Sequence, residues 1–121
     1  GYRDDIELLM RSSSLGVIAS TGWDSFTMSS VEMMSSGLPL IVSNLQGLAE
    51  TIENGKNGYT ITPGDYEGLR DCIKDLVGSD ELRNSFSVAS RRRAVDLFSK
   101  DIQVIEISKI ITKFTEFASR V

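Results

Sequence analysis

Three short apolar runs, separated by stretches with helical spacing, constrain the fold of this chain more than any other feature. The runs cover residues 15–20, 40–43 and 59–62, and each has the length of a β-strand. The first is apolar almost throughout, as expected for a strand buried within a parallel sheet. Helices are predicted between the runs over 26–36 and 48–52. Strand, helix, strand, helix and strand in this order predict an α/β fold with a parallel sheet and right-handed crossovers.

Further helices flank this pattern on both sides. One is predicted over 3–13, before the first strand, and three more follow the last strand over 66–77, over 80–98 and from Lys100 onward. The last of these helices has five large apolar residues on the side that we expect to be buried: Ile102, Ile105, Ile110, Ile111 and Phe114.

The whole chain, 121 residues long, is expected to be one domain at most. Residues 1–65 should form its α/β core and residues 66–121 its C-terminal helices. Three strands are fewer than the roughly five or six of a complete nucleotide-binding sheet. We therefore expect the chain to be part of a larger domain.

The composition excludes several kinds of chemistry. The chain has no histidine and one cysteine, Cys72, so Ser–His catalysis, an internal disulfide and a cysteine metal cluster are excluded within it. Cys72 falls in a predicted helix, where a reduced and buried thiol is expected, and this favours a cytoplasmic protein. With 13 basic and 17 acidic residues the formal charge is -4, which argues against a nucleic-acid partner. No apolar run approaches the roughly 20 residues that a membrane span needs.

Two acids stand eight positions apart on either side of the first predicted strand-to-helix turn. Asp24 lies where a strand ends, which is where open α/β sheets bind ligands, although a loop aspartate or a helix N-cap is an equal interpretation. Glu32 lies within the helix, where its carboxylate can accept two hydrogen bonds from adjacent hydroxyl groups. Its alternatives are a solvated glutamate or a capping box with Ser29. Residues 25–28 should expose unpaired N–H groups, which bind anions.

Residues near these acids have structural interpretations. Gly37 is predicted to end the helix in a left-handed conformation, and Pro39 to begin the next strand. Trp23 is expected to anchor the loop by packing, with a place at the rim of a site as the alternative. The three arginines at 91–93 point in different directions on a helix, so we expect a solvated face, with attraction to a membrane surface as the lesser alternative.

The run from Asp24 to Pro39 resembles the acid-x7-Glu signature of retaining GT-B glycosyltransferases, the large family often numbered 4. The usual form is Glu-Gly-Phe-Gly followed by Glu-Ala-Met and Gly-x-Pro. This chain keeps Phe26, Glu32, Met34, Gly37 and Pro39, and it has Asp24 where Glu is usual and Thr27 where Gly is usual. The likeness extends over almost the whole chain and is sharpest over 19–65.

The resemblance implies the C-terminal half of a GT-B donor-binding domain, with a Rossmann-like sheet of about three strands. Such enzymes move a sugar from a nucleoside-diphosphate sugar to a hydroxyl acceptor with retention, without a cofactor or a metal, often in glycan or cell-surface polysaccharide assembly. The resemblance gives each matching residue a role: Asp24 is catalytic at the donor sugar, Glu32 binds the ribose, and Phe26, Thr27, Met28 and Ser29 bind the diphosphate and sugar. Gly47 and Glu50 match a Gly-x-x-Glu that shapes the next turn, with Glu50 near a helix start.

The resemblance also implies missing partners. The acceptor-binding N-terminal domain lies outside this chain, as does the Arg and Lys pair that usually grips the diphosphate. We therefore expect a fragment that is inactive alone, that self-associates through the bare edge of its first strand, and whose parent associates peripherally with a membrane. The alternatives are a non-catalytic nucleotide-binding or interaction module of the same fold, and a GT-B-shaped 2-epimerase, against which the acid-x7-Glu run argues.

Overall fold

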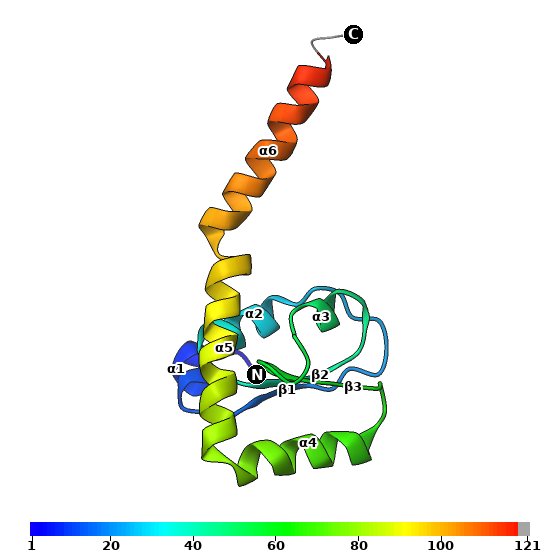
Figure 1. Cartoon of the computed structure of the whole chain (residues 1–121), viewed down its shortest axis with the longest axis vertical. Coiled ribbons are helices and arrows are strands. Elements are labelled where there is room, and N and C mark those ends of the chain that lie inside the picture. Colours follow the sequence, from blue (N-terminus) through cyan, green and yellow to red (C-terminus); the bar gives the residue numbers. More distant parts are fainter. Residues whose placement is uncertain (119–121) are drawn as a thin grey trace.

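The structure is a computed structural model and describes residues 1–118 of the chain (Figure 1). Three strands and six helices are present in this part of the chain. In chain order they are α1 (Ile6–Arg11), β1 (Gly16–Ile18), α2 (Met28–Ser35), β2 (Leu40–Ser43), α3 (Gln46–Glu50), β3 (Gly58–Ile61), α4 (Tyr66–Gly78), α5 (Asp80–Phe98) and α6 (Lys100–Ala118).

The three strands form one parallel sheet in the order β1-β2-β3, which confirms the predicted α/β fold. All four residues of the central strand β2 are buried. Leu40 lies opposite Gly58 in the register with β3, and a Cβ atom added to Gly58 would lie 2.1 Å from the carbonyl oxygen of Leu40. The two strands can therefore approach one another as they do only because residue 58 has no side chain.

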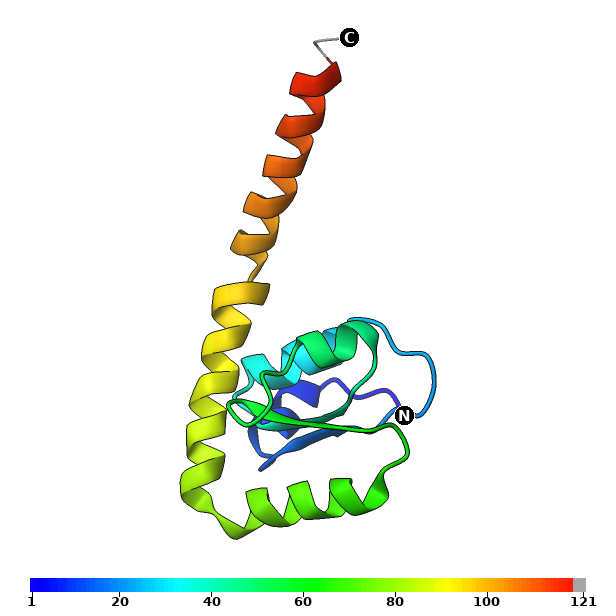
Figure 2. The ribbon, with the colours of Figure 1, turned by 45° about the vertical axis from the view of Figure 1, so that its right-hand side comes forward.

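Two hydrophobic clusters fill the two faces of the sheet. Helices α1, α2 and α3 lie on one face and α4 on the other, while α5 passes beside the sheet (Figures 1 and 2). The cluster on the first face comprises Met10, Met34, Leu38, Leu40, Val42, Leu48, Ile52 and Ala94. The cluster under α4 comprises Ile41, Ile61, Leu76 and Phe86. Because α5 supplies a residue to each cluster, it holds the layers together.

The first strand forms a bare edge of the sheet, as expected, but it is less buried than its apolar run indicates. Within the described residues β1 pairs with β2 alone and forms an edge of the sheet, and Val17 is 36% exposed. A continuous apolar run indicates that a strand is apolar on both faces, but it does not show whether another element covers each face. Helix α1 also begins at Ile6 instead of residue 3, and Met10 is its one buried residue.

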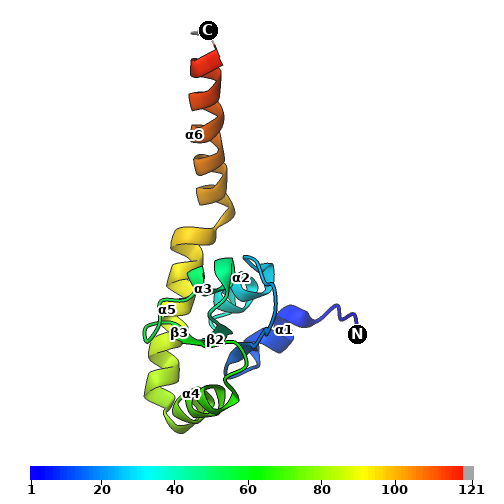
Figure 3. The same cartoon turned by 90° about the vertical axis from the view of Figure 1, so that its right-hand side faces the viewer.

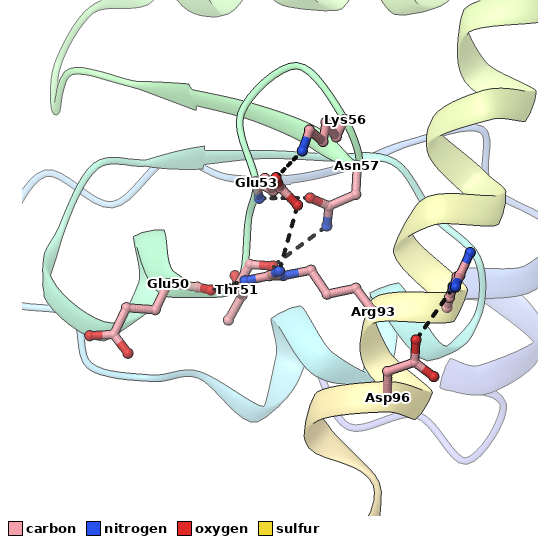
Figure 4. A network of polar contacts seen from close by, with 8 residues as sticks. Glu50, Thr51, Glu53, Lys56, Asn57, Arg93 and Asp96 are labelled. Atoms are coloured by element: carbon pink, nitrogen blue, oxygen red, sulfur yellow. Dashed lines mark hydrogen bonds and ion pairs between the residues drawn. The ribbon is translucent and has the colours of Figure 1, made fainter.

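Two of the three adjacent arginines bond to helix ends, and one of these, Arg93, is half-buried, so the predicted solvated face is wrong for Arg93. Arg91 donates a hydrogen bond to the carbonyl oxygen of Ser35, the last residue of α2. Arg93 donates to the carbonyl oxygens of Glu50 and Thr51 at the end of α3, each at 2.9 Å (Figure 4). The last carbonyls of a helix have no partner within it, and arginine side chains satisfy them. Arg91 and Arg92 are exposed as predicted, and 82% of the Arg92 side chain is accessible to solvent.

Helix α6 extends away from the rest of the molecule (Figures 2 and 3). The chain turns at Ser99, which has extended backbone angles between α5 and α6. No residue of α6 is buried, so its predicted apolar side is present but uncovered. Its exposed large apolar residues are Val104, Ile105, Ile107, Ile110, Ile111, Phe114 and Phe117. Among the helices within residues 1–118, none combines the length and the apolar composition that crossing a membrane requires.

Candidate functional site

The loop between β1 and α2 carries three of the predicted site residues, Asp24, Phe26 and Thr27. It leaves the sheet at the carboxyl end of β1, the edge at which parallel sheets bind ligands. Asp24 is half-buried in this loop and accepts a 2.5 Å hydrogen bond from the hydroxyl of Ser20. The N-cap of α2 is Thr27, so the interpretation of Asp24 as an N-cap is wrong. Ser20 holds the carboxylate near the end of the strand.

The first turn of α2 has no side-chain cap. Thr27 has extended backbone angles, and its hydroxyl makes no hydrogen bond to the helix. The Oγ1 atom of Thr27 is buried without a partner among the described residues. The first N–H groups of a helix lack partners within it, and an uncapped end leaves them available to an anion. Ser29 lies in this first turn, so it cannot be the N-cap of a capping box with Glu32.

The helical spacing of Met28, Val31 and Met34, with Leu38 just beyond, predicts a buried stripe on α2, and Met28 departs from it. Val31, Met34 and Leu38 are buried as expected, whereas Met28 is 62% exposed. The helix begins at Met28, two residues later than predicted, so Met28 lies at the end of the helix and not within it. The exposed side chain therefore stands beside the uncapped helix end.

Glu32 is exposed on α2 and lines a hollow of about 450 Å³ between α1 and α2. Ile6, Met10 and Arg11 from α1 and Met28 and Val31 from α2 also line it. The hollow combines apolar walls with the carboxylates of Glu7 and Glu32 and the cationic side chains of Arg11 and Arg91, as ligand pockets commonly do.

Trp23 does not pack as expected. It is 93% exposed and lines a separate hollow of about 240 Å³ with Leu45 and Gln46, at the carboxyl ends of β1 and β2. Gln46 has a φ of +32°, a conformation that residues other than glycine rarely adopt and that is found at functional sites. Gln46 could not be predicted as a site residue, because nothing in the neighbouring sequence requires a positive φ there.

Phe26 is held from two sides. A Cβ atom on Gly47 would lie 2.8 Å from the backbone nitrogen of Phe26, so the first turn of α3 meets the loop only because residue 47 is glycine. On the other side, the ring of Phe98 packs edge-on against the ring of Phe26, with the centroids 5.1 Å apart. Phe98 was not predicted, since a contact between residues so distant in sequence leaves no local pattern.

Gly37 and Pro39, for which structural roles are predicted, lie directly after α2 and end the helix. Gly37 has a φ of +81°, and the N–H groups of Gly37 and Leu38 donate to the carbonyls of Met34 and Met33 at 2.9 and 3.0 Å. This is the Schellman arrangement, which requires a left-handed residue. Pro39 is buried before β2, and its carbonyl accepts a hydrogen bond from Gly16.

Glu50 is the last residue of α3, so its predicted place near a helix start is wrong. Its carbonyl oxygen accepts the hydrogen bond from Arg93 (Figure 4). The predicted helix began two residues too late, because the first turn of α3 contains Gln46 and Gly47, which carry no helix signal.

Neither cysteine nor metal chemistry is favoured by the arrangement of titratable groups. Burial raises the pKa of the Cys72 thiol, and the carboxylates of Asp75, Asp71 and Asp65 raise it further. A thiol with a raised pKa is a poor nucleophile at neutral pH. Within residues 1–118, no group of three or more His, Cys, Asp or Glu side chains is placed to hold a metal ion.

A parallel sheet with polar residues at the carboxyl ends of its strands, followed by an uncapped helix, defines the Rossmann-like class of nucleotide-binding folds. Comparison with known families identifies one family within this class. Residues 1–93 match the model of the group 1 glycosyl transferases. The chain therefore belongs to the group 1 glycosyl transferase family, and the family resemblance of its signature run is confirmed.

Two curated relatives illustrate the relationship. Spore coat protein SA of Bacillus subtilis is 38% identical over 97 residues, which cover 78% of this chain and 25% of the relative. The capsular polysaccharide biosynthesis glycosyltransferase CapM of Staphylococcus aureus is 27% identical over 85 residues, which cover 70% of this chain and 22% of CapM. The chain thus spans about a quarter of the length of these relatives.

Solved structures of glycosyltransferases share the fold. The crystal structure of Anabaena Alr3699/HepE in complex with UDP superimposes with a TM-score of 0.78 and 26% identity, over 100% of this chain and 31% of HepE. TarM superimposes with a TM-score of 0.78 and 25% identity, over 89% of this chain and 22% of TarM. These neighbours have GT-B architecture, and the chain corresponds to the C-terminal part of such enzymes.

Proposed function

We propose that this chain is the nucleotide-sugar-binding part of a retaining glycosyltransferase that transfers a hexose to a hydroxyl acceptor in polysaccharide or glycan assembly. The observation that carries the proposal is the uncapped first turn of α2, flanked by Asp24 and Glu32 at the carboxyl end of the sheet. An uncapped helix end suits a diphosphate, and carboxylates suit sugar and ribose hydroxyls. The bound UDP and UDP-glucose of HepE support a nucleotide-sugar donor.

Each residue has a distinct role in this proposal. Glu32 accepts hydrogen bonds from the ribose hydroxyls in the hollow beside α1. The backbone N–H groups from Phe26 to Met28, with the hydroxyls of Thr27 and Ser29, bind the diphosphate. The buried and unpartnered Oγ1 of Thr27 is a donor that a phosphate oxygen would satisfy, and this compensates for the glycine that the family usually has there.

Asp24 is the proposed catalytic residue. As the bond from the anomeric carbon to the diphosphate breaks, positive charge develops on the sugar ring, and a fixed carboxylate stabilises it. The hydrogen bond from Ser20 keeps the Asp24 carboxylate oriented before the donor binds. Aspartate is one methylene shorter than the usual glutamate, so we propose that the donor sugar lies closer to β1 than in relatives with glutamate.

The remaining parts of the proposal concern the whole protein. We propose that it needs no metal or other cofactor, binds no nucleic acid, and acts in the cytoplasm, at the inner face of the membrane. The acceptor binds to an N-terminal domain outside this chain, so the chain alone is expected to be inactive. The alternative is a non-catalytic nucleotide-binding or interaction module, which the replacements at positions 24 and 27 favour.

Titration with UDP, GDP and ADP, followed by ligand-observed NMR, tests the binding part of this proposal. Saturable binding of one nucleotide supports the donor site and identifies the base. Absence of binding to all three at millimolar concentration contradicts it. In the full-length protein, a product with the anomeric configuration of the donor supports retention, an inverted product contradicts it, and an isolated nucleotide-sugar epimer would indicate the epimerase.

The exposed edge of β1 leads to a prediction about assembly. We expect the isolated chain to self-associate through this edge, because unpaired strand edges pair with other chains, and its sedimentation coefficient should rise with concentration. Val17→Lys places a charge on the edge strand and should reduce the association, whereas Val88→Lys, at an exposed valine of α5, should not. A sedimentation coefficient that is independent of concentration would contradict the prediction. Loss of association in Phe114→Lys alone would assign it to α6 instead.

A further inference from the structure

Phe98 connects the proposed diphosphate loop to the end of the long helix α5. Its ring meets the ring of Phe26 edge-on, at a centroid distance of 5.1 Å and an interplanar angle of 62°. This is the favourable geometry for an aromatic pair, which stabilises the contact beyond the area that it buries. Phe26 immediately precedes Thr27, the N-cap of α2. The contact therefore acts two residues before the first residue of the uncapped helix.

Phe98 lies in a part of the molecule that is held in place by packing and by hydrogen bonds. It packs against the hydrophobic cluster on the α1–α3 face of the sheet. Arg93, one and a half turns earlier in α5, is bonded to the carbonyls of Glu50 and Thr51 at the end of α3. Gly47 at the other end of α3 touches the backbone of Phe26. The loop is thus enclosed between α3 and α5, and these two helices are bonded to one another.

We propose that Phe98 is a positioning residue for donor binding, which acts through Phe26 and fixes the N–H groups of the loop in the orientation that a diphosphate requires. This inference rests on the proposed function of the loop. Without the ring, Phe26 keeps Gly47 as its neighbour but loses the contact on its other side, and the loop becomes more mobile. A site that has to be ordered when its ligand binds has a lower affinity, because the ordering costs entropy.

Phe98→Leu tests the proposal, since leucine keeps an apolar side chain of similar size but removes the aromatic edge. We expect lower heteronuclear ¹⁵N NOE values at the amides of Phe26 and Thr27, and nucleotide affinity reduced by about two- to tenfold. Phe98→Tyr keeps the ring and should retain both properties. Ile52→Val perturbs the same hydrophobic cluster from the end of α3 and should also retain both.

A double-mutant cycle with Phe26→Leu separates positioning from general stability. If Phe98 acts through Phe26, adding Phe98→Leu to the Phe26→Leu variant should have no further effect on affinity for UDP, GDP or ADP, whichever the wild type binds. Additive losses, or NOE values in Phe98→Leu equal to those in Ile52→Val, would overturn the proposal. If the wild type binds none of the three nucleotides, the proposed function fails, while the NOE comparison still decides whether Phe98 orders the loop.

Discussion

Replacing Glu32 by alanine is expected to weaken the binding of nucleoside diphosphates by about ten- to a hundredfold. A charge-assisted hydrogen bond contributes about 1.5–3 kcal/mol, which corresponds to this loss of affinity. Glu32 is exposed on α2 and makes no contact to the hydrophobic core, and alanine is a good helix former. The substitution should therefore leave the free energy of unfolding almost unchanged. Titration of both proteins with the nucleotide that the wild type binds measures the effect.

Glu81→Ala is the matched control for Glu32→Ala, because Glu81 is also an exposed helical glutamate but lies on α5 away from the loop. Its affinity should equal that of the wild type. Glu32→Gln should fall between the wild type and Glu32→Ala, since the amide keeps an acceptor but loses the charge. Equal affinities in Glu32→Ala and Glu81→Ala would show that the hollow between α1 and α2 does not hold the ribose.

Gly58→Ala is expected to lower the free energy of unfolding by about 3 kcal/mol or more. The new methyl group would lie 2.1 Å from the carbonyl oxygen of Leu40, and this atom belongs to the backbone of the central strand. This clash can be relieved only if β2 and β3 separate. The expected cost is therefore at the upper end of, or above, the roughly 1–3 kcal/mol that overpacking usually costs. Urea unfolding followed by circular dichroism measures the change.

Gly22→Ala provides the reference for this substitution. A Cβ atom on Gly22 meets nothing within 4 Å, so we expect a change within about 0.5 kcal/mol. Fluorescence is a poor probe for both variants, because the single tryptophan, Trp23, is exposed in the folded protein. Equal stability of the two variants would mean that the register of β2 and β3 is wrong.

The order of the helices and strands, and the position of the signature run at the first strand-to-helix turn, could be predicted from the sequence. Gly37, Pro39 and the apolar strands are local signals, and each acts within a few residues of its own position. The asymmetric placement of Asp24 and Glu32, one at a strand end and one inside the next helix, follows from the same local signals. The roles of these two acids in binding stay predictions.

The predictions that were wrong concern which apolar faces are covered by another element of the fold. A buried stripe was predicted to include Met28 and one face of α6, but periodicity shows only that a face is apolar, and another element has to be present to bury it. Arg93 and Phe98 were misjudged or missed because their partners lie in α3 and in the β1–α2 loop. Contacts of this kind are defined by the packing of helices and have no counterpart in the local sequence.

The arginines at the helix ends also determine when the chain can become stable. Arg91 and Arg93 bond to carbonyls that lie 56 and 42 positions earlier in the chain. Until α5 is synthesised and docks, the ends of α2 and α3 lack these partners and the sheet lacks Phe86 and Ala94. Contacts over such separations form slowly. A nascent chain that has not yet reached residue 98 therefore exposes an incomplete core, and the docking of α5 determines when this aggregation-prone surface is covered.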